Sequence, residues 1–188
     1  MCKVLVVVDM QNDFISGSLG TEEAKKVVPN VVQKIKEYNA YNNIVVFTKD
    51  THKFNYLTTQ EGKNLPIEHC IKDTWGWEIE NSCRKAWKET RSMVITGNLR
   101  NTFYKDTFGS VELAQFIKDN SDFIDEIEFC GLCTEICVIS NIALVKAFCP
   151  EIKIKVDANC CAGVTPEKHR EALSVMESIQ VEIVNKGE

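Results

Sequence analysis

The residue of this chain best placed for nucleophilic chemistry is a cysteine near the start of a helical segment. Cys137 lies three residues after Thr134, and threonine is a good N-cap for the helix that we expect to follow. A thiol in the first turn feels the positive end of the helix dipole, so we expect its pKa to fall. Backbone N–H groups at the same helix start lack partners within the helix and are suited to hold an oxyanion. This combination is half of an acyl-transfer site; the alternative is a buried cysteine on an apolar helix.

Two further residues would complete the acid–base chemistry. Asp9 follows the apolar run 4–8, and a buried carboxylate needs a partner or a raised pKa. Asp9 is therefore a candidate to take the thiol proton and pass it to a leaving amine, although it could also serve only to cap the strand end. Lys105 lies in an expected loop before a helix. A loop lysine is most often a solvated surface residue, so the interest of Lys105 depends on its convergence with Asp9 and Cys137.

A second cluster has the residue types of a metal site. Asp50 and His52 follow an apolar run, and His69 comes seventeen residues after His52. Two histidines and one carboxylate form a common ligand set for zinc and iron, and Glu61 could add a fourth ligand. The alternative is a loop that happens to contain two of the chain's three histidines. The third, His169, is expected on the surface of the last helix.

The chain has nine cysteines and no expected signal peptide, so we expect reduced thiols rather than disulfides. The spacing of Cys130, Cys133 and Cys137 also allows a metal-cluster or thiol redox function. Structural zinc usually requires a second ligand pair of matching spacing. Cys160 and Cys161 are adjacent and cannot form such a pair, so the metal-cluster interpretation is disfavoured.

The elements that would position these residues alternate between apolar strands and amphipathic helices. Four helices are expected, at Glu22–Tyr38 with Pro29 delaying or bending it, and at Ser110–Lys118, Glu135–Phe148 and Pro166–Ile179. The expected strands are Lys3–Asp9, Asn43–Lys49, Ser92–Thr96, Glu126–Gly131, Lys153–Asp157 and Gln180–Val184. This order predicts a three-layer α/β sandwich with a mostly parallel, roughly six-stranded, Rossmann-like sheet in one domain, 1–188. The long polar connection Thr51–Trp87 is a further candidate for function.

Ligands of such sheets bind at the carboxyl ends of the strands, where Asp9, Asp50, Lys105 and Cys137 would all meet. The chain has 22 basic and 27 acidic residues, a net charge of −5 and an estimated pI of about 5.4. This balance argues against nucleic acid or an anionic membrane as partner. No apolar run approaches the roughly 20 residues of a membrane span, so we expect a cytoplasmic protein.

The assembled motifs resemble the isochorismatase-like cysteine hydrolases, the superfamily that includes nicotinamidases. The resemblance extends over nearly the whole chain and rests on three runs: Val6-Val7-Val8-Asp9-Met10-Gln11-Asn12-Asp13-Phe14, then Asp50-Thr51-His52 with Pro66 and His69-Cys70, and Gly131-Leu132-Cys133-Thr134-Glu135-Ile136-Cys137-Val138. It implies a triad of Cys137, Asp9 and Lys105. It also implies a cis peptide bond between Leu132 and Cys133, which would direct the Cys133 N–H to the oxyanion together with that of Cys137.

In nicotinamidases a zinc or iron ion binds the pyridine nitrogen, through ligands that match Asp50, His52 and His69. The resemblance therefore implies hydrolysis of a small-molecule amide with a divalent metal, zinc or else iron, and an oligomer of identical subunits. Isochorismatases proper lack the cysteine and cleave an ether, so its presence indicates an amidohydrolase. An amidase for another small amide or ureido compound is the main alternative, and a thiol redox or binding module is a further one.

Two departures from the family pattern concern the substrate pocket. The run Leu65-Pro66-Ile67-Glu68-His69 is one residue longer than the usual one and lacks an aromatic residue before the proline. Phe14, Trp75 or Trp77 could supply the missing ring. The commonest spacing would place the triad lysine at Thr102, but Lys105 is the only lysine between Lys88 and Lys118.

Overall fold

The computed structural model describes residues 2–41, 43–88 and 102–186. The strands within these ranges are β1 (Cys2–Val8), β2 (Ile44–Asp50), β3 (Thr102–Lys105), β4 (Ile124–Leu132), β5 (Lys153–Ala162) and β6 (Glu182–Val184). They form one parallel sheet in the order β3-β2-β1-β4-β5-β6. The chain thus starts at the centre of the sheet, builds outward to β3, and returns across β1 to build the other half.

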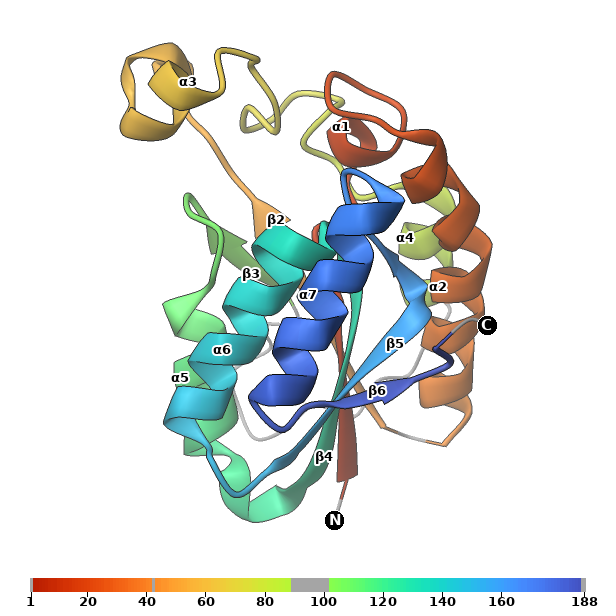
Figure 1. The fold of residues 1–188 in the computed structure, drawn as a ribbon. Helices are drawn as coiled ribbons and strands as arrows, with labels where there is room; N and C mark the ends of the chain where they lie inside the picture. Colours follow the sequence, from red (N-terminus) through yellow and green to blue (C-terminus); the bar gives the residue numbers. More distant parts are fainter. Residues whose placement is uncertain (1, 42, 89–101, 187–188) are drawn as a thin grey trace.

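Helices cover both faces of this sheet (Figure 1). The longer helices are α2 (Glu22–Ala40), α4 (Asn81–Lys88), α5 (Val111–Asp119), α6 (Ile139–Phe148) and α7 (Pro166–Ser178). In Figure 1, α5, α6 and α7 lie in front of the sheet, and α2 and α4 lie behind it. Short helical turns occur at α1 (Asn12–Ile15), η1 (Tyr56–Thr58), α3 (Gln60–Asn64), η2 (Ser121–Phe123) and η3 (Thr134–Val138). The predicted three-layer α/β sandwich is confirmed.

Two helices show why the chain folds locally as it does. Thr21 caps α2 by accepting a hydrogen bond from the Ala24 N–H, and α2 begins at Glu22 and continues through Pro29. Its buried face carries Ala24, Val27, Val31, Ile35 and Tyr38, which is the spacing of one helix face. Helix α7 begins at Pro166, after the predicted N-cap Thr165, since proline suits a position whose N–H has no helical partner.

The edge strand β3, formed by Thr102–Lys105, was not predicted. The predicted strand Ser92–Thr96 lies outside the described residues. Lys105 is therefore the last residue of a strand and not a loop residue. The polar connection after β2 also contains α3 and α4, which were not predicted. Short elements of four to eight residues carry too few periods for a hydrophobic pattern to reveal them.

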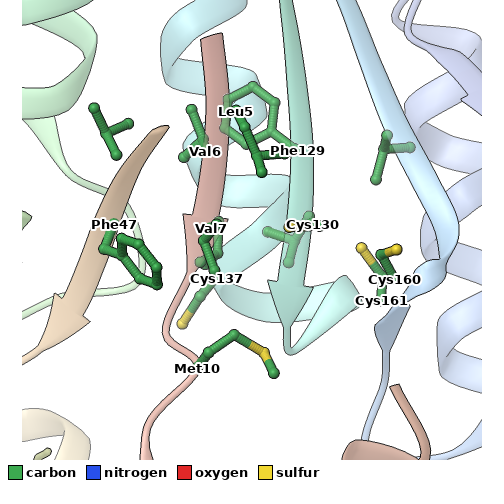
Figure 2. Packing of buried hydrophobic residues seen from close by; sticks show 14 of the residues in the cluster. Leu5, Val6, Val7, Met10, Phe47, Phe129, Cys130, Cys137, Cys160 and Cys161 are labelled. Atoms are coloured by element: carbon green, nitrogen blue, oxygen red, sulfur yellow. The ribbon is translucent and has the colours of Figure 1, made fainter. Parts of the chain in front are cut away.

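The core is densest along the central strands. Every residue from Val4 to Val8 is fully buried, because β1 has a strand on each side and helices on each face. Figure 2 shows Val7, Phe47 and Cys130, from β1, β2 and β4, among the buried side chains around Cys137. Each fully buried valine or phenylalanine stabilises the fold by roughly 1.5–3 kcal/mol. The sheet is therefore a rigid support for side chains at its edge.

Across the described residues, none of the helices combines the length and apolar character that a membrane span requires. The expected cytoplasmic location and assembly into homo-oligomers stay predictions.

Candidate active site and metal centre

The site lies where four parallel strands end. In the sheet register Asp50 is opposite Lys105, and Val8, which precedes Asp9, is opposite Gly131. Parallel strands point the same way, so their last residues meet at one edge. Gly131 has a φ of +117°, and a Cβ there would lie 2.1 Å from the Val8 carbonyl oxygen. A glycine at this point lets the end of β4 approach the end of β1.

Asp9 is fully buried in an unusual backbone conformation. Its φ is +46°, in the left-handed region that residues other than glycine rarely adopt and that clusters at functional sites. Thr48 of β2 holds it at two points: the hydroxyl donates to Asp9 Oδ1 at 2.6 Å and accepts from the Asp9 N–H at 3.2 Å. The carboxylate is thereby fixed beside the end of β3.

Lys105 connects the acid–base residues to the thiol. Its Nζ lies 2.6 Å from Asp9 Oδ2, 3.4 Å from Asp50 Oδ1 and 3.5 Å from Cys137 Sγ. Thr102 stands at the opposite end of β3, paired with Phe47, so of these two positions Lys105 is the one that reaches Asp9. The predicted convergence of Asp9, Lys105 and Cys137 is present in the geometry, and their catalytic roles stay predictions.

The expectation of a lowered Cys137 pKa is wrong for this structure. Burial raises the pKa of the thiol well above its ordinary value, and the Lys105 ammonium only partly opposes this. Burial also raises the pKa of Asp9 despite Lys105. Burial disfavours the ammonium of Lys105, but the negative partners, Asp9 first, raise its pKa well above the ordinary value. The resting site therefore holds a neutral thiol, a permanent cation and a carboxyl group of raised pKa.

The turn that carries Cys137 is a short π-helix, η3, which leads into α6. Cys133 occupies the N-cap position, and no side chain caps this end, so the predicted capping by Thr134 is wrong. The N–H groups of Ile136 and Val138 both donate to the Cys133 carbonyl, at 3.1 Å each. The Leu132–Cys133 peptide bond is cis, the geometry that the family resemblance implies.

The metal-type side chains converge beside this triad. Asp50 Oδ2 lies 3.0 Å from His52 Nε2 and 3.5 Å from His69 Nε2. Glu61 Oε1 approaches the same two nitrogens to 3.7 and 3.6 Å. Among the described residues, the one group of at least three histidine, cysteine or acidic side chains that converges closely enough for an ion is Asp50, His52 and His69. Within the same described residues, the cysteines of the alternative metal-cluster interpretation form no such group.

The chemistry of these side chains fits a divalent cation. His52 Nε2 is buried and makes no hydrogen bond among the described residues, although a carboxylate is near it. The His69 Nδ1 lies 2.8 Å from the Ile67 carbonyl oxygen, which leaves Nε2 to face the cluster. Metal-bound histidines commonly use a backbone carbonyl in this way. Burial would raise the pKa of Asp50, but Lys105 and the histidines hold it well below its usual range, so the acceptor is ionised.

Gln11 holds Asp50 in place, a function that the sequence pattern did not reveal. The buried side chain donates from Nε2 to the Asp50 carbonyl at 2.8 Å and accepts at Oε1 from the Asp50 N–H at 2.7 Å. A third bond joins Nε2 to the Trp77 carbonyl at 2.9 Å. The sequence did offer one indication. Gln11 is a polar residue that closely follows the buried strand β1, and a buried polar side chain needs hydrogen-bond partners.

The aromatic residues proposed for the pocket have different surroundings. The Phe14 ring lies 5.6 Å from that of His69, so it borders the metal-type cluster. Trp77 is engaged elsewhere, because the Lys49 Nζ lies 3.0 Å from its ring centroid, and Trp75 is largely exposed. The Tyr56 ring, which was not predicted, lies 4.6 Å from the ring of His52 and 5.0 Å from that of His69.

A cavity of about 900 Å³ opens beside this cluster. Its lining includes His52, Tyr56 and Glu61 of the polar connection, together with Phe108 and Ile136. Pockets of 300–1,000 Å³ are typical of small-molecule sites.

Two predictions about side chains outside the triad have different outcomes. All nine cysteines are free thiols, as expected. His169 was expected on the surface, but it is half-buried and its Nδ1 lies 2.8 Å from Thr134 Oγ1. A single histidine on an amphipathic helix gives no sequence signal for such a contact.

Comparisons with known proteins agree on one family. Residues 3–187 match the family model of the isochorismatase domain. The chain is 24% identical to the nicotinamidase of Saccharomyces cerevisiae, over 72% of this chain and 77% of that protein.

Two solved structures share the fold along nearly the whole chain. The nicotinamidase/pyrazinamidase PncA of Bacillus subtilis has a TM-score of 0.81 and 25% identity, over 97% of this chain and 99% of that one. The pyrazinamidase of Pyrococcus horikoshii, solved in complex with zinc, has a TM-score of 0.76 and 25% identity, over 97% and 98% of the two chains.

Proposed function

Because this chain belongs to the isochorismatase family of hydrolases, we propose that it is a cysteine amidohydrolase that converts nicotinamide to nicotinate and ammonia. The observation that carries this proposal is the position of the Lys105 ammonium, in contact with both the Asp9 carboxylate and the Cys137 thiol. A thiol nucleophile next to an acid–base group is the arrangement that acyl transfer requires. The named relatives that act on nicotinamide or pyrazinamide support the choice of substrate.

The raised pKa of the thiol determines how the first step proceeds. Since burial disfavours a free thiolate, Asp9 removes the proton while the sulfur attacks the amide carbonyl carbon. The carbon–sulfur bond forms, and the carbonyl π electrons move to the oxygen. The resulting oxyanion is held by the N–H groups of Cys133, at the N-cap of η3, and of Cys137, within η3. Lys105 stays cationic and orients Asp9 through the whole cycle.

The second half of the reaction reuses the same groups. The tetrahedral adduct collapses, the C–N bond breaks, and Asp9 returns its proton to the departing ammonia. Water then attacks the thioester with Asp9 as base, the C–S bond breaks, and Cys137 recovers its proton. One carboxyl group thus serves as base and acid in turn, and its raised pKa suits both roles.

A divalent ion fits the side chains of Asp50, His52 and His69, with Glu61 as a further ligand. When bound, it would supply a Lewis acid to which a pyridine nitrogen can bind, which would orient the ring and its amide. Two imidazoles and a carboxylate favour zinc, and iron(II) is the alternative for the same donor set. Phe14 is placed to border the ring.

The size of the cavity favours a second candidate, an amidase for a larger amide or a ureido compound. A single pyridine ring fills a minor part of about 900 Å³, and the lining includes polar side chains such as Lys53, Asn55 and Gln60. The triad chemistry would be unchanged, because only the group attached to the carbonyl carbon differs.

The test is ammonia release from nicotinamide, pyrazinamide, aliphatic amides and ureido compounds, with Cys137→Ala beside the wild type. Cys149→Ala is the matched control, since Cys149 is a buried thiol at the far end of α6. We expect release from nicotinamide that Cys137→Ala abolishes and Cys149→Ala retains. Release only from ureido or aliphatic amides would replace nicotinamide by the second candidate. Release that survives in Cys137→Ala would exclude the cysteine mechanism.

A further inference from the structure

We propose that His169 is a positioning residue for the active site, which holds the oxyanion-binding turn in place through its contact with Thr134. This inference rests on the proposed function. The Thr134 side chain is fully buried, and its Oγ1 lies 2.8 Å from the His169 Nδ1. Thr134 directly follows Cys133, whose N–H is one of the two proposed oxyanion donors. His169 belongs to the first turn of α7, thirty-five residues away in the chain.

A second bond ties the next residue to the same segment. Glu135 Oε1 accepts from the Val164 N–H at 2.8 Å. The approach is close: a Cβ on Gly163 would lie 2.7 Å from Glu135 Oε2 and 2.8 Å from the His169 N. Two consecutive residues of the turn are therefore fixed to the segment 164–169, which leads into α7.

Contacts from outside the turn supplement the hydrogen bonds that it makes itself. The Cys133 carbonyl accepts from the N–H groups of Ile136 and Val138, but no side chain caps the start of the turn. At the other end of the turn, the buried Asn141 donates from Nδ2 to the Cys137 carbonyl at 2.8 Å. The turn is thus held at its end by α6 and at its start by His169. A displacement of about 1 Å at a reacting group can cost about 100-fold in rate.

The identity of the bonded nitrogen makes the proposal specific. An asparagine side chain can place its amide near the position of a histidine Nδ1, whereas a glutamine amide reaches toward the position of Nε2. Burial lowers the pKa of His169, so a neutral amide is a reasonable replacement for the ring. Asparagine should therefore substitute for His169 and glutamine should not.

The first experiment compares His169→Asn, His169→Gln and His169→Phe in steady-state ammonia release. We expect kcat to fall about tenfold or more in the Gln and Phe variants with little change in KM, and to stay within about threefold of wild type in the Asn variant. Arg170→Ala, on the same helix and exposed, is the control. Thr134→Val should resemble His169→Phe, and the double variant should be no worse than either, because both remove one contact.

The second experiment needs no turnover. Pyridine-3-carboxaldehyde adds to Cys137 to form a thiohemiacetal: the sulfur bonds to the carbonyl carbon, the π pair moves to oxygen, and the thiol proton passes to Asp9. Iodoacetamide alkylates the same sulfur at a saturated carbon, with loss of iodide and no oxyanion. We expect His169→Phe to weaken the aldehyde adduct about tenfold and to leave the alkylation rate within about twofold of wild type.

The outcomes separate this inference from the function on which it rests. If the wild type hydrolyses nicotinamide but His169→Phe keeps its kcat, or if Asn and Gln behave alike, His169 is only a packing residue. If the wild type releases no ammonia but the aldehyde effect appears as described, the proposed function fails and the positioning role stands. Equal loss of aldehyde affinity and alkylation rate would show a general collapse of the turn and would overturn the proposal.

Discussion

Replacing Lys105 by methionine tests the buried charge network most directly, because one ammonium serves two carboxylates. Nζ lies 2.6 Å from Asp9 and 3.4 Å from Asp50. At an effective dielectric constant of about 20, the attraction at 2.6 Å is roughly 6 kcal/mol. Desolvation of the three buried groups offsets part of it, and removal of one partner of a buried ion pair typically costs about 3–5 kcal/mol. We expect Lys105→Met to lower the free energy of unfolding by that amount.

The variants Lys105→Met and Asp9→Asn should differ in how much stability they lose. In Asp9→Asn, Lys105 keeps Asp50 as a partner, whereas in Lys105→Met both carboxylates lose the ammonium and Asp50 keeps only its histidines. Lys105→Met should therefore be more destabilising than Asp9→Asn, and the double variant should lose less than the sum of the two.

The pH dependence has a definite sign. Loss of Lys105 raises the pKa of Asp9 further above its unfolded value, so stability is retained below the unfolded pKa and lost as the pH rises through the folded one. The defect of Lys105→Met should therefore be larger at pH 8 than at pH 5.

The assay is urea unfolding followed by circular dichroism, with a chelator present so that metal binding does not add to stability. Lys118→Met, on the exposed side of α5, serves as the control for loss of a lysine. A loss below about 1 kcal/mol for Lys105→Met at pH 8, or a loss smaller than that of Asp9→Asn, would refute the reasoning about this network.

Three further predictions concern metal binding and the pH dependence of activity. Gln11→Leu frees the backbone of Asp50 and should weaken metal affinity or activity about 10- to 100-fold, measured by zinc titration; unchanged affinity would contradict the positioning of Asp50 by Gln11. The acid limb of the profile of kcat/KM against pH should lie above the ordinary aspartate pKa of about 4, because burial raises that of Asp9 and activity needs its basic form; a limb at or below that value would exclude Asp9 as the base. His52→Ala should abolish tight zinc binding, because the substitution removes a buried ligand nitrogen that has no hydrogen bond in the described structure. Equal zinc content in the wild type and the variant would show that the ion binds elsewhere.

The fold class was readable from the sequence because it depends on local pattern. Runs such as Val4 to Val8 are apolar throughout. This pattern is typical of strands in a parallel sheet, because helices bury both faces of such a sheet. The helices α2 and α7 start where Thr21 and Thr165 can cap them. The edge strand β3 was not predicted, because a strand of four residues carries almost no periodic signal.

The site was partly readable for the same reason. Residues at or after the carboxyl ends of parallel strands share one edge of the sheet. The sequence alone therefore predicted that Asp9, Asp50 and Lys105 lie close together. The direction of the shift in the Cys137 pKa could not be predicted in this way, because it depends on how much solvent the surrounding chain removes. The sequence suggested that a helix dipole lowers the pKa of the thiol. The folded protein buries the thiol so completely that desolvation prevails and raises its pKa.

Residue types and their order along the chain thus determine the α/β sandwich, the acid–base and metal-type side chains, and the edge at which they meet. Only the tertiary structure decides which atoms touch: the bonds of Gln11 to Asp50, the reach of Lys105 to three partners, and the contact of His169 with Thr134. Local pattern is set by neighbours in sequence, through strand and helix periodicity. Contacts between distant segments depend on packing distances of a few ångströms, and the pattern within one segment does not determine these distances.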